Sequence, residues 1–358
     1  MIILIPARDE AGALQSTLPA VRAAARPFDQ IHVVADHCRD ATAAVASDGG
    51  ACVHVRSGPE PAGKGQAIRW WLDQTRREST AEQVILILDA DSLPGPGLTE
   101  ALDRRMDGNA ALQARVEPIV RTDSPLVRIS AFSEFVEQRV SDQLRTLLGW
   151  PVRLRGTGMA FRRSILEKAA DSLRTCAEDL ELTLLLASWR VPILAIQEAV
   201  VFDPKPENAS GAIRQRARWL KGQIQVLREY PSLILQLLAS GPWAWSLLGS
   251  ALIKPKTLLI PTKVIGIALF WTASAAIPSL RLLAVGCMVS LAFDFLVLAV
   301  GIYLASNRRF ALGALLHMPS YFFLWVKSLL MAARSGEHWL RVRHALPRDA
   351  LADSVAPD

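Results

Sequence analysis

The sequence is poor in cysteine, and its cysteines are not grouped. None of them forms a C-x-x-C motif, which argues against a disulfide framework and against a metal centre recognisable from cysteine spacing. We therefore expect reduced thiols, as in cytoplasmic and membrane proteins. The 358 residues contain four cysteines: Cys38, Cys52, Cys176 and Cys287.

Other signals are also missing. No G-x-G-x-x-G motif follows the first predicted strand, which disfavours a dinucleotide-binding domain. No basic run with interleaved aromatic residues suggests a nucleic-acid groove, so we attribute the net charge of +6 to contact with anionic lipid headgroups. The amino terminus has a short apolar run with no basic region before it, unlike a signal peptide. We expect the amino-terminal part to stay in the cytoplasm.

Charged residues are distributed unevenly along the chain. They occur throughout residues 1–230, become rare in residues 231–333 and return in residues 334–358. The first part is long enough for one sizeable domain. We predict a cytoplasmic α/β domain, a membrane region and a polar cytoplasmic tail.

Short apolar runs alternate with helical patterns in the first part of the chain. This alternation is typical of βαβ units and predicts a doubly wound, mostly parallel sheet. The predicted strands are Ile2–Pro6, Ile31–Ala35, Cys52–Arg56, the run that ends at Asp89, and Ala110–Pro118. The predicted helices are Ala13–Ala25, Ala41–Ser47, Gly65–Arg77 and the long segment Pro125–Trp150.

Two carboxylates follow the most apolar of these runs. Val-Ile-Leu-Ile-Leu at 84–88 is followed by Asp89, Ala90 and Asp91. Ligands of open α/β sheets bind at the carboxyl ends of strands. Mg²⁺ is usually held there by one or two carboxylates together with substrate phosphates. The pair predicts a cation and phosphate site, although a strand that ends in a polar turn would give the same pattern.

Further motifs follow one another in a characteristic order. They are Ile-Pro-Ala-Arg-Asp-Glu (5–10), Val-Val-Ala-Asp-His-Cys-Arg-Asp-Ala-Thr (33–42), Gly-Lys-Gly (63–65), Leu-Asp-Ala-Asp-Ser (88–92), Gly-Thr-Gly-Met-Ala-Phe-Arg (156–162), Ala-Glu-Asp-Leu-Glu-Leu (177–182) and Gln-Arg-Ala-Arg-Trp (215–219). In this order and spacing, residues 1–230 resemble a family 2 glycosyltransferase with the GT-A fold. The resemblance is to the membrane-attached branch that includes cellulose, chitin and hyaluronan synthases and ceramide glucosyltransferase.

The resemblance implies a donor site built from the first half of the chain. In it, Asp36 holds the uracil or ribose of a UDP-sugar, Asp91 ligates Mg²⁺ or Mn²⁺ on the diphosphate, and Asp89 contacts the ribose or the outer coordination sphere of the cation. Lys64, between two glycines, offers a point charge to a nucleotide, although an exposed loop lysine would have the same pattern. The remaining donor-side residues are expected after the first strand, namely Pro6, Ala7 and Glu10.

The acidic pair at 178–179 begins an apolar helical pattern. Acidic residues in a first turn also favour a helix through its dipole, so the pair alone does not establish a catalytic role. By resemblance, Asp179 is the general base, with Glu178 beside it. Deprotonation of an acceptor hydroxyl suits a partly buried carboxylate. Ala177 departs from the threonine usual in the family, which affects the acceptor side.

The acceptor or diphosphate side is expected from two further motifs. Gln215, Arg218 and Trp219 share one helix face at i, i+3 and i+4. Trp219 offers a wall for a sugar ring and Arg218 a planar fork for oxygens, although an interfacial amphipathic helix would show the same residues. The second motif is Gly156, Thr157 and Gly158, where glycines would let the backbone approach the donor sugar; a plain turn is the alternative.

The membrane region contains apolar segments of different length. Residues 257–277 and 282–306 each suffice to span a bilayer, and we expect them to form a hairpin. Residues 231–253, broken by Gly241 and Pro242, are expected to form an interfacial helix, and residues 311–333 are ambiguous. Asp294 should face the interior of the bundle, whereas Lys263 could extend to the interface. Two crossings keep the flanking basic residues cytoplasmic, and four are the alternative.

Together these features predict an inverting, metal-dependent glycosyltransferase of the hexosyltransferase class. It would move one sugar from a UDP-sugar to a lipid or lipid-linked saccharide at the cytoplasmic face of the cell membrane. One alternative is a processive polysaccharide synthase subunit that works with a partner channel or as a homo-oligomer. Another is a non-catalytic protein that binds sugar nucleotides. The sugar, the acceptor and the pathway stay open.

Overall fold

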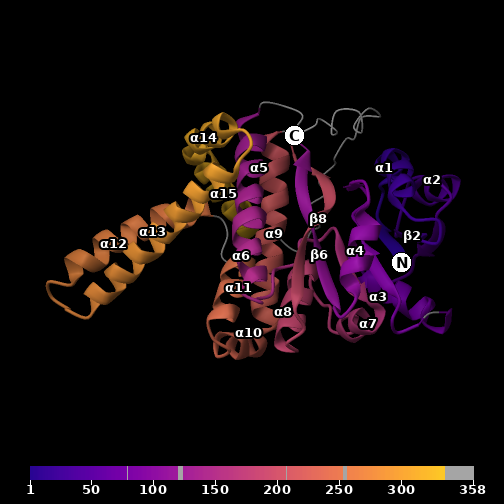
Figure 1. The fold of residues 1–358 in the computed structure, drawn as a ribbon, viewed down its shortest axis with the longest axis horizontal. Coiled ribbons are helices and arrows are strands. Elements are labelled where there is room, and N and C mark those ends of the chain that lie inside the picture. Colours follow the sequence, from indigo (N-terminus) through magenta and orange to yellow (C-terminus); the bar gives the residue numbers. More distant parts are fainter. Residues whose placement is uncertain (79, 120–123, 207, 253–255, 335–358) are drawn as a thin grey trace.

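The computed structural model describes residues 1–78, 80–119, 124–206, 208–252 and 256–334. Nearly all of the predicted polar tail, including the basic residues at 341–344, lies outside these ranges. In the described part of the chain, an α/β body precedes a set of apolar helices (Figure 1).

One mixed sheet organises the body. Its strands stand in the order β3-β2-β1-β4-β7-β6-β8-β5. β1 is parallel to β2 and β4, β2 to β3, and β6 to β8, whereas β7 runs antiparallel to β4 and β6, and β5 to β8. The prediction of an α/β, mostly parallel sheet is confirmed. The strands are β1 (Ile2–Ala7), β2 (Gln30–Asp36), β3 (Cys52–Arg56), β4 (Val84–Ile87), β5 (Leu93–Pro94), β6 (Ala111–Ile119), β7 (Met159–Arg162) and β8 (Ile193–Pro204).

Helices cover both faces of this sheet. Ile3 and Ile5 of β1 pack on one side, whereas Ile2 and Leu4 pack on the other, as strand geometry requires. The first side is covered by α1 (Ala11–Ala24), α2 (Thr42–Asp48) and α4 (Leu98–Met106). The second is covered by α3 (Lys64–Gln74), α7 (Arg163–Ala170) and α8 (Glu178–Ser188). Burial on two faces explains why the central strands β1 and β4 are entirely apolar.

The long helix predicted at Pro125–Trp150 is interrupted. It consists of α5 (Pro125–Val136), a π-helical segment (Glu137–Asp142) and α6 (Gln143–Leu147). Within the π-helical segment, the Gln138 side chain makes two hydrogen bonds to the backbone of Val116 in β6. This tertiary contact satisfies groups that would otherwise be buried without partners, and the sequence pattern could not indicate it.

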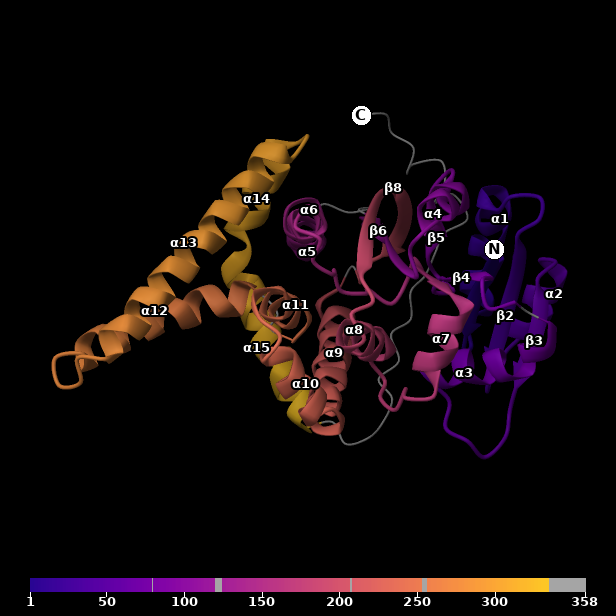
Figure 2. The same ribbon diagram turned by 60° about the horizontal axis from the view of Figure 1, so that its bottom comes forward.

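The apolar helices follow α9 (Ala209–Glu229). They are α10 (Pro231–Leu238), α11 (Pro242–Leu252), α12 (Lys256–Ala273), α13 (Leu280–Leu304), α14 (Arg308–Leu316) and α15 (Met318–Arg334). The break expected at Gly241 separates α10 from α11. α12 and α13 project from the body side by side as a hairpin (Figures 1 and 2).

Only part of the predicted membrane topology is supported by helix length. Among the described residues, α13 alone is both long and apolar enough to cross a bilayer; α14 and α15, bent by 55° at their junction, would form a second span if they act as one. The apolar stretch of α12, Leu259–Ala273, is shorter than the predicted 257–277, because the helix ends at Ala273. These helices are the structural indication of membrane association.

The hairpin contains an internal ion pair. Asp294, midway along α13, is buried and contacts Lys263 of α12. Asp294 therefore faces the hairpin interior as predicted. Lys263 does not extend to an interface, because it neutralises Asp294, and an unpaired charge is costly in an apolar environment.

Two of the apolar helices, α15 and α13, are attached directly to the body. Arg216 of α9 donates to Ser130 Oγ of α5 at 3.0 Å and to Tyr321 Oη of α15 at 2.6 Å. A Cβ on Gly301 of α13 would come within 2.6 Å of Val136 of α5, so these helices pack closely. The apolar helices are thus joined directly to the elements that carry the site described next.

Candidate active site

Lys64 lies at the centre of the predicted site. Its Nζ lies 2.6 Å from Asp89 Oδ1, 2.6 Å from the carbonyl oxygen of Gly156 and 3.2 Å from Glu178 Oε1. Burial opposes its charge, but Asp89 and Glu178 outweigh that effect and raise the pKa of the ammonium. The alternative of a free loop lysine is wrong. One side chain joins the Gly-Lys-Gly, Asp-x-Asp, Gly-Thr-Gly and Glu-Asp motifs.

Asp36 holds the loop that presents Lys64. Its side chain is 3% exposed. Oδ2 accepts the backbone N–H of Gly63 at 2.8 Å, and Oδ1 accepts Arg56 Nη1 at 2.6 Å and contacts His37 Nδ1 at 2.8 Å. The contacts of Asp36 are therefore with the protein, and its role toward uracil or ribose stays a prediction. Arg56 was not anticipated from the sequence.

The Gly-Thr-Gly segment supports the Asp-x-Asp loop. Thr157 Oγ1 accepts the backbone N–H of Asp89 at 3.2 Å and donates to Ser92 Oγ at 2.9 Å. Gly156 and Gly158 have φ values of +88° and +67°, which favour glycine. A Cβ on Gly158 would also lie 3.0 Å from Ala114 and Val201. The glycines are thus required by backbone conformation and close packing.

A group of carboxylates surrounds Asp91. Burial raises the pKa of Asp91 well above its ordinary value, and the negative charges of Asp203, Asp89 and Glu10 raise it further. Asp203 lies on β8, and its neighbour Phe202 pairs with Leu93 of β5, which follows the Asp-x-Asp motif; this pairing brings Asp203 close to Asp91. Carboxylate oxygens that disfavour one another's ionisation are a donor set suited to a hard divalent cation. Asp203 lies in no recognised motif, and the sequence did not reveal it.

The acidic pair begins α8, where the dipole stabilises negative charge. Burial raises the pKa of Glu178 to about 7; the Lys64 ammonium opposes that shift, whereas Asp179 and Asp89 add to it. Asp179 Oδ1 accepts the backbone N–H of Leu180 at 2.8 Å, which fixes its orientation. The two neighbours differ, because Glu178 is buried on Lys64 whereas Asp179 is partly exposed.

The residues predicted on α9 share that helix but differ in exposure. Gln215 is buried and Trp219 is 40% exposed, with Arg218 intermediate. Further along α9, the Gln225 side chain accepts the backbone N–H of Cys176 at 3.3 Å, just before the acidic pair. Hence α9 packs against the beginning of α8, whereas contact of its predicted face with a substrate stays a prediction.

The predicted donor-side residues Pro6 and Ala7 are the last two residues of β1, and the backbone N–H of Glu10 donates to Thr42 Oγ1 at 2.9 Å.

An ionic network at Arg155, next to Gly156, was not predicted. Arg155 contacts Glu134 at 2.9 Å and also contacts Asp142 of the π-helical segment. This network ties the Gly-Thr-Gly segment to α5, so that the interrupted helix has a direct structural effect on the site.

Residues 1–222 match the family model described as glycosyltransferase like family 2. The chain belongs to this glycosyltransferase family. It is also similar to a probable glycosyltransferase, YdaM of Bacillus subtilis, with 26% identity over 238 residues. That similarity covers 64% of this chain and 56% of YdaM, so the chain spans little more than half the length of this relative.

The chain is also similar to solved glycosyltransferases, at low identity. Mannosyltransferase PcManGT from Pyrobaculum calidifontis, in complex with GDP-Man and Mn²⁺, is 17% identical with a TM-score of 0.48, and the match covers 93% of this chain and 85% of that one. TarS 1-349 of S. aureus, in complex with UDP-GlcNAc, is 12% identical with a TM-score of 0.43, and 68% of each chain is covered. The α/β sheet of this glycosyltransferase fits the GT-A fold implied by the sequence motifs.

Proposed function

We propose that this glycosyltransferase is inverting and metal-dependent, and that it transfers one sugar from a nucleotide sugar, a UDP-sugar in the first place, to a hydroxyl of a lipid or lipid-linked saccharide. The observation that carries the proposal is the position of Lys64, whose ammonium contacts both Asp89 of the Asp-x-Asp motif and Glu178 of the acidic pair. A general base, a cation site and a fixed positive charge are the elements that displacement at a sugar carbon requires.

The donor side has the oxygen ligands that Mg²⁺ or Mn²⁺ would need. Asp91 would hold the cation, with Asp89 alongside, and Glu10 and Asp203 add negative charge nearby. A bound cation would supply electrostatic stabilisation to the departing diphosphate. The fit rests on the chemistry of the donor set, because partly buried carboxylate oxygens are the ligands that a hard divalent cation prefers.

The acceptor side is assigned to Asp179. Its carboxylate takes the proton of the acceptor hydroxyl, whose oxygen attacks the sugar carbon as the bond to the diphosphate breaks. One displacement inverts the configuration at that carbon. Glu178 is a positioning residue, because its contact is with Lys64 rather than with open space. Gln215, Arg218 and Trp219 would line the acceptor path, since α9 packs against the start of α8.

The hairpin supports a membrane-resident acceptor. α13 has 25 residues, a length of about 37 Å at 1.5 Å per residue, which exceeds a bilayer core of about 30 Å. Arg281 lies over Trp271 at one end of the hairpin, and Arg308 over Tyr303 at the other. Trp and Tyr are enriched at both membrane interfaces, where their rings lie at the level of the headgroups.

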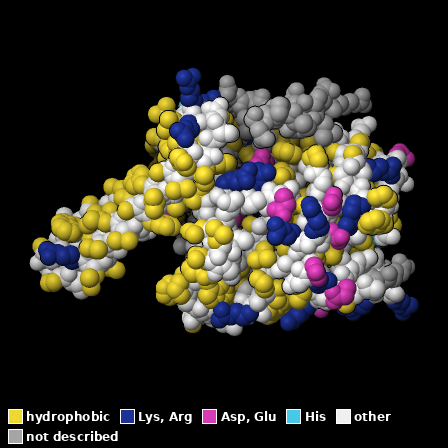
Figure 3. Space-filling model, viewed as in Figure 1, with side chains coloured by type: hydrophobic (Ala, Val, Ile, Leu, Met, Phe, Trp, Pro, Cys, Tyr) yellow, Lys and Arg dark blue, Asp and Glu magenta, His cyan; other side chains and the backbone are white. Residues whose placement is uncertain are grey.

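Apolar side chains are exposed between these two ends. Examples are Ile265 at 59%, Leu269 at 61% and Val289 at 65% exposed, and Figure 3 shows the apolar surface of the projecting hairpin. A surface of this kind is unfavourable in water. We therefore place residues 231–333 in or on the cell membrane, with two crossings, and residues 1–230 in the cytoplasm.

The proposal is tested by nucleotide-sugar turnover in detergent-solubilised full-length protein. Wild type, Asp179→Asn and Asp91→Asn are compared with Asp171→Asn, a matched control whose side chain is 68% exposed. We expect UDP release by wild type and the control, and a loss of about a hundredfold or more in both site variants, since Asp179→Asn removes the general base and Asp91→Asn removes the proposed ligand of the catalytic cation. Donor binding without turnover in wild type would favour the non-catalytic alternative. Full activity of Asp179→Asn would contradict the assigned base.

A further inference from the structure

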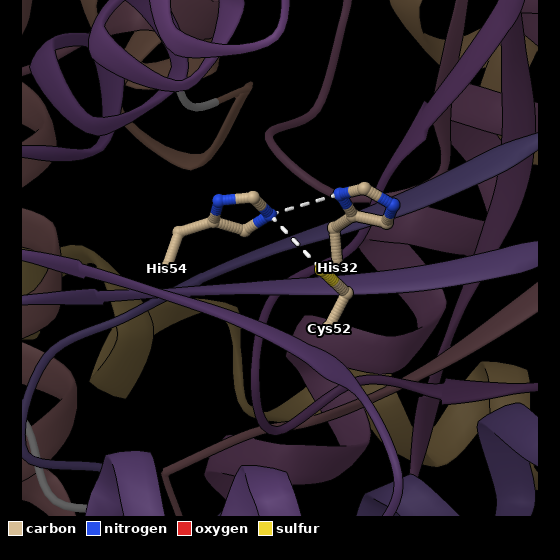
Figure 4. A group of neighbouring side chains, drawn as sticks. All are labelled: His32, Cys52 and His54. Carbon is tan, nitrogen blue, oxygen red and sulfur yellow. Dashed lines mark hydrogen bonds between the residues drawn. The ribbon is translucent and has the colours of Figure 1, made fainter. Parts of the chain in front are cut away.

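Three side chains of metal-ligand type meet on β2 and β3, at one end of the sheet order and apart from the carboxylate site. His32 lies on β2, and Cys52 and His54 lie two residues apart on β3, so they share one face. The register pairs His32 directly with Cys52. One potential ligand atom of each side chain lies within 4.8 Å of the other two (Figure 4).

The separations approach those of a metal site. His32 Nδ1 lies 3.0 Å from His54 Nε2, and Cys52 Sγ lies 3.5 Å from the same His54 nitrogen. Tetrahedral zinc with ordinary bond lengths requires about 3.3 Å between two nitrogens and about 3.6 Å between nitrogen and sulfur. Side-chain shifts of a few tenths of an ångström would therefore bring His54 Nε2 to the separations from His32 Nδ1 and Cys52 Sγ that a shared zinc ion requires.

The contacts of His32 Nδ1 define what a cation would have to replace. Trp71 Nε1, which can only donate, contacts His32 Nδ1 at 3.2 Å, so this nitrogen carries its lone pair toward Trp71, and a cation would take the place of that hydrogen bond. Because His32 Nδ1 then accepts, the proton in its 3.0 Å contact with His54 Nε2 belongs to His54, and cation binding would move that proton to His54 Nδ1 or to solvent.

We propose that His32, Cys52 and His54 bind one borderline-soft transition-metal cation, with Zn²⁺ the first candidate. Thiolate and imidazole ligands select such cations, whereas the oxygen-rich site around Asp91 suits Mg²⁺ or Mn²⁺. Binding would ionise the Cys52 thiol, whose proton passes to solvent. Cys52 is exposed, so solvent can supply a further ligand.

The expected consequence is structural. β3 is the edge strand and pairs with β2 alone in the sheet order. The cation would join these strands near their beginnings, and the contact between Arg56 and Asp36 joins them at their ends. Because Asp36 also holds the Gly63 backbone, the cation would stabilise the part of the sheet that presents Lys64.

The test uses untagged, full-length protein in detergent, stripped with a chelator and kept in excess Mg²⁺ to occupy oxygen sites. Co²⁺ is titrated as a spectroscopic probe and then displaced with Zn²⁺. We expect one Co²⁺ per chain with a thiolate-to-cobalt absorption band, and a higher thermal midpoint with Zn²⁺. Cys52→Ser should lose the band, and His54→Asn should weaken binding on the order of tenfold or more, since even residues that only orient ligands have effects of that size. The control Cys287→Ser should behave as wild type.

Three results would overturn the proposal: no thiolate band in wild type, the same band in Cys52→Ser, or an unchanged affinity in His54→Asn. The metal-free thermal midpoints show whether each variant folds. If His54→Asn fails to fold, Cys52→Ser decides alone, because its side chain is exposed and the substitution nearly isosteric.

Discussion

Replacing Lys64 with methionine should destabilise the protein through the carboxylates that it leaves behind. Methionine keeps the length of the side chain and removes the charge. The Lys64 side chain is 17% exposed and that of Glu178 is 9% exposed, and removing one partner of such a buried pair typically costs about 3–5 kcal/mol. The contact with Asp89, which is 38% exposed, adds at most about 1 kcal/mol.

We expect a loss of about 3 kcal/mol, at the lower limit of that range, because Glu178 can respond by taking up a proton. For a domain of this size that corresponds to a fall of about 6 °C in thermal midpoint. Detergent-solubilised wild type, Lys64→Met, Glu178→Gln and the double variant are compared at pH 8, with the exposed Lys168→Met as control. The double variant should recover about 1–2 kcal/mol relative to Lys64→Met, which is the usual size of coupling between contacting residues. A midpoint of Lys64→Met close to that of the control, or no recovery in the double variant, would refute this reasoning.

Further predictions concern pH, helix packing and the hairpin. Because folding raises the pKa of Glu178 from 4.5 to about 7, the folded protein binds its proton more tightly than the unfolded chain, and the stability from this group falls as pH rises from about 4.5 to about 7. The thermal midpoint of wild type should therefore fall relative to that of Glu178→Gln between pH 5 and pH 8; parallel profiles would contradict this. Gly222→Ala would place a Cβ 2.7 Å from Ala177 and should destabilise by about 1–3 kcal/mol in thermal unfolding, whereas Gly249→Ala, with open space around it, should not. Asp294→Leu should lower the midpoint in detergent by leaving Lys263 unpaired, and the double change with Lys263→Leu should restore it; equal midpoints of single and double variants would count against an important ion pair.

Local signals were enough to predict the elements that follow a regular pattern. The strands β1, β2, β3 and β4 stand within about two residues of their predicted bounds. β1 and β4 are buried on two faces and leave an uninterrupted apolar pattern. β8 was not predicted, since Gln197 and Glu198 interrupt its pattern and its register with β6 shifts beside Arg115. The π-helical segment depends on Gln138 reaching a strand that is distant in the sequence.

The motifs of the site could be predicted, but the contacts between them could not. Asp89, Asp91 and the acidic pair stand at a strand end and a helix start, which local sequence indicates. The bridge from Lys64 to Glu178 joins residues far apart in the chain and exists only in the folded protein. Asp203 follows an ordinary apolar run without a motif, and Asp36 contacts Arg56 and Gly63, which a family resemblance did not indicate.

The most direct test of the proposed function is UDP release together with mass spectrometry of the lipid product. Purified full-length protein with Mn²⁺ or Mg²⁺ is screened against a panel of nucleotide sugars, with and without a total membrane lipid extract. The account predicts lipid-dependent release from one donor and a lipid that gains the mass of a single sugar. A polymeric product would show a processive synthase, and a lack of release from every donor despite measurable nucleotide binding would contradict the proposed transfer.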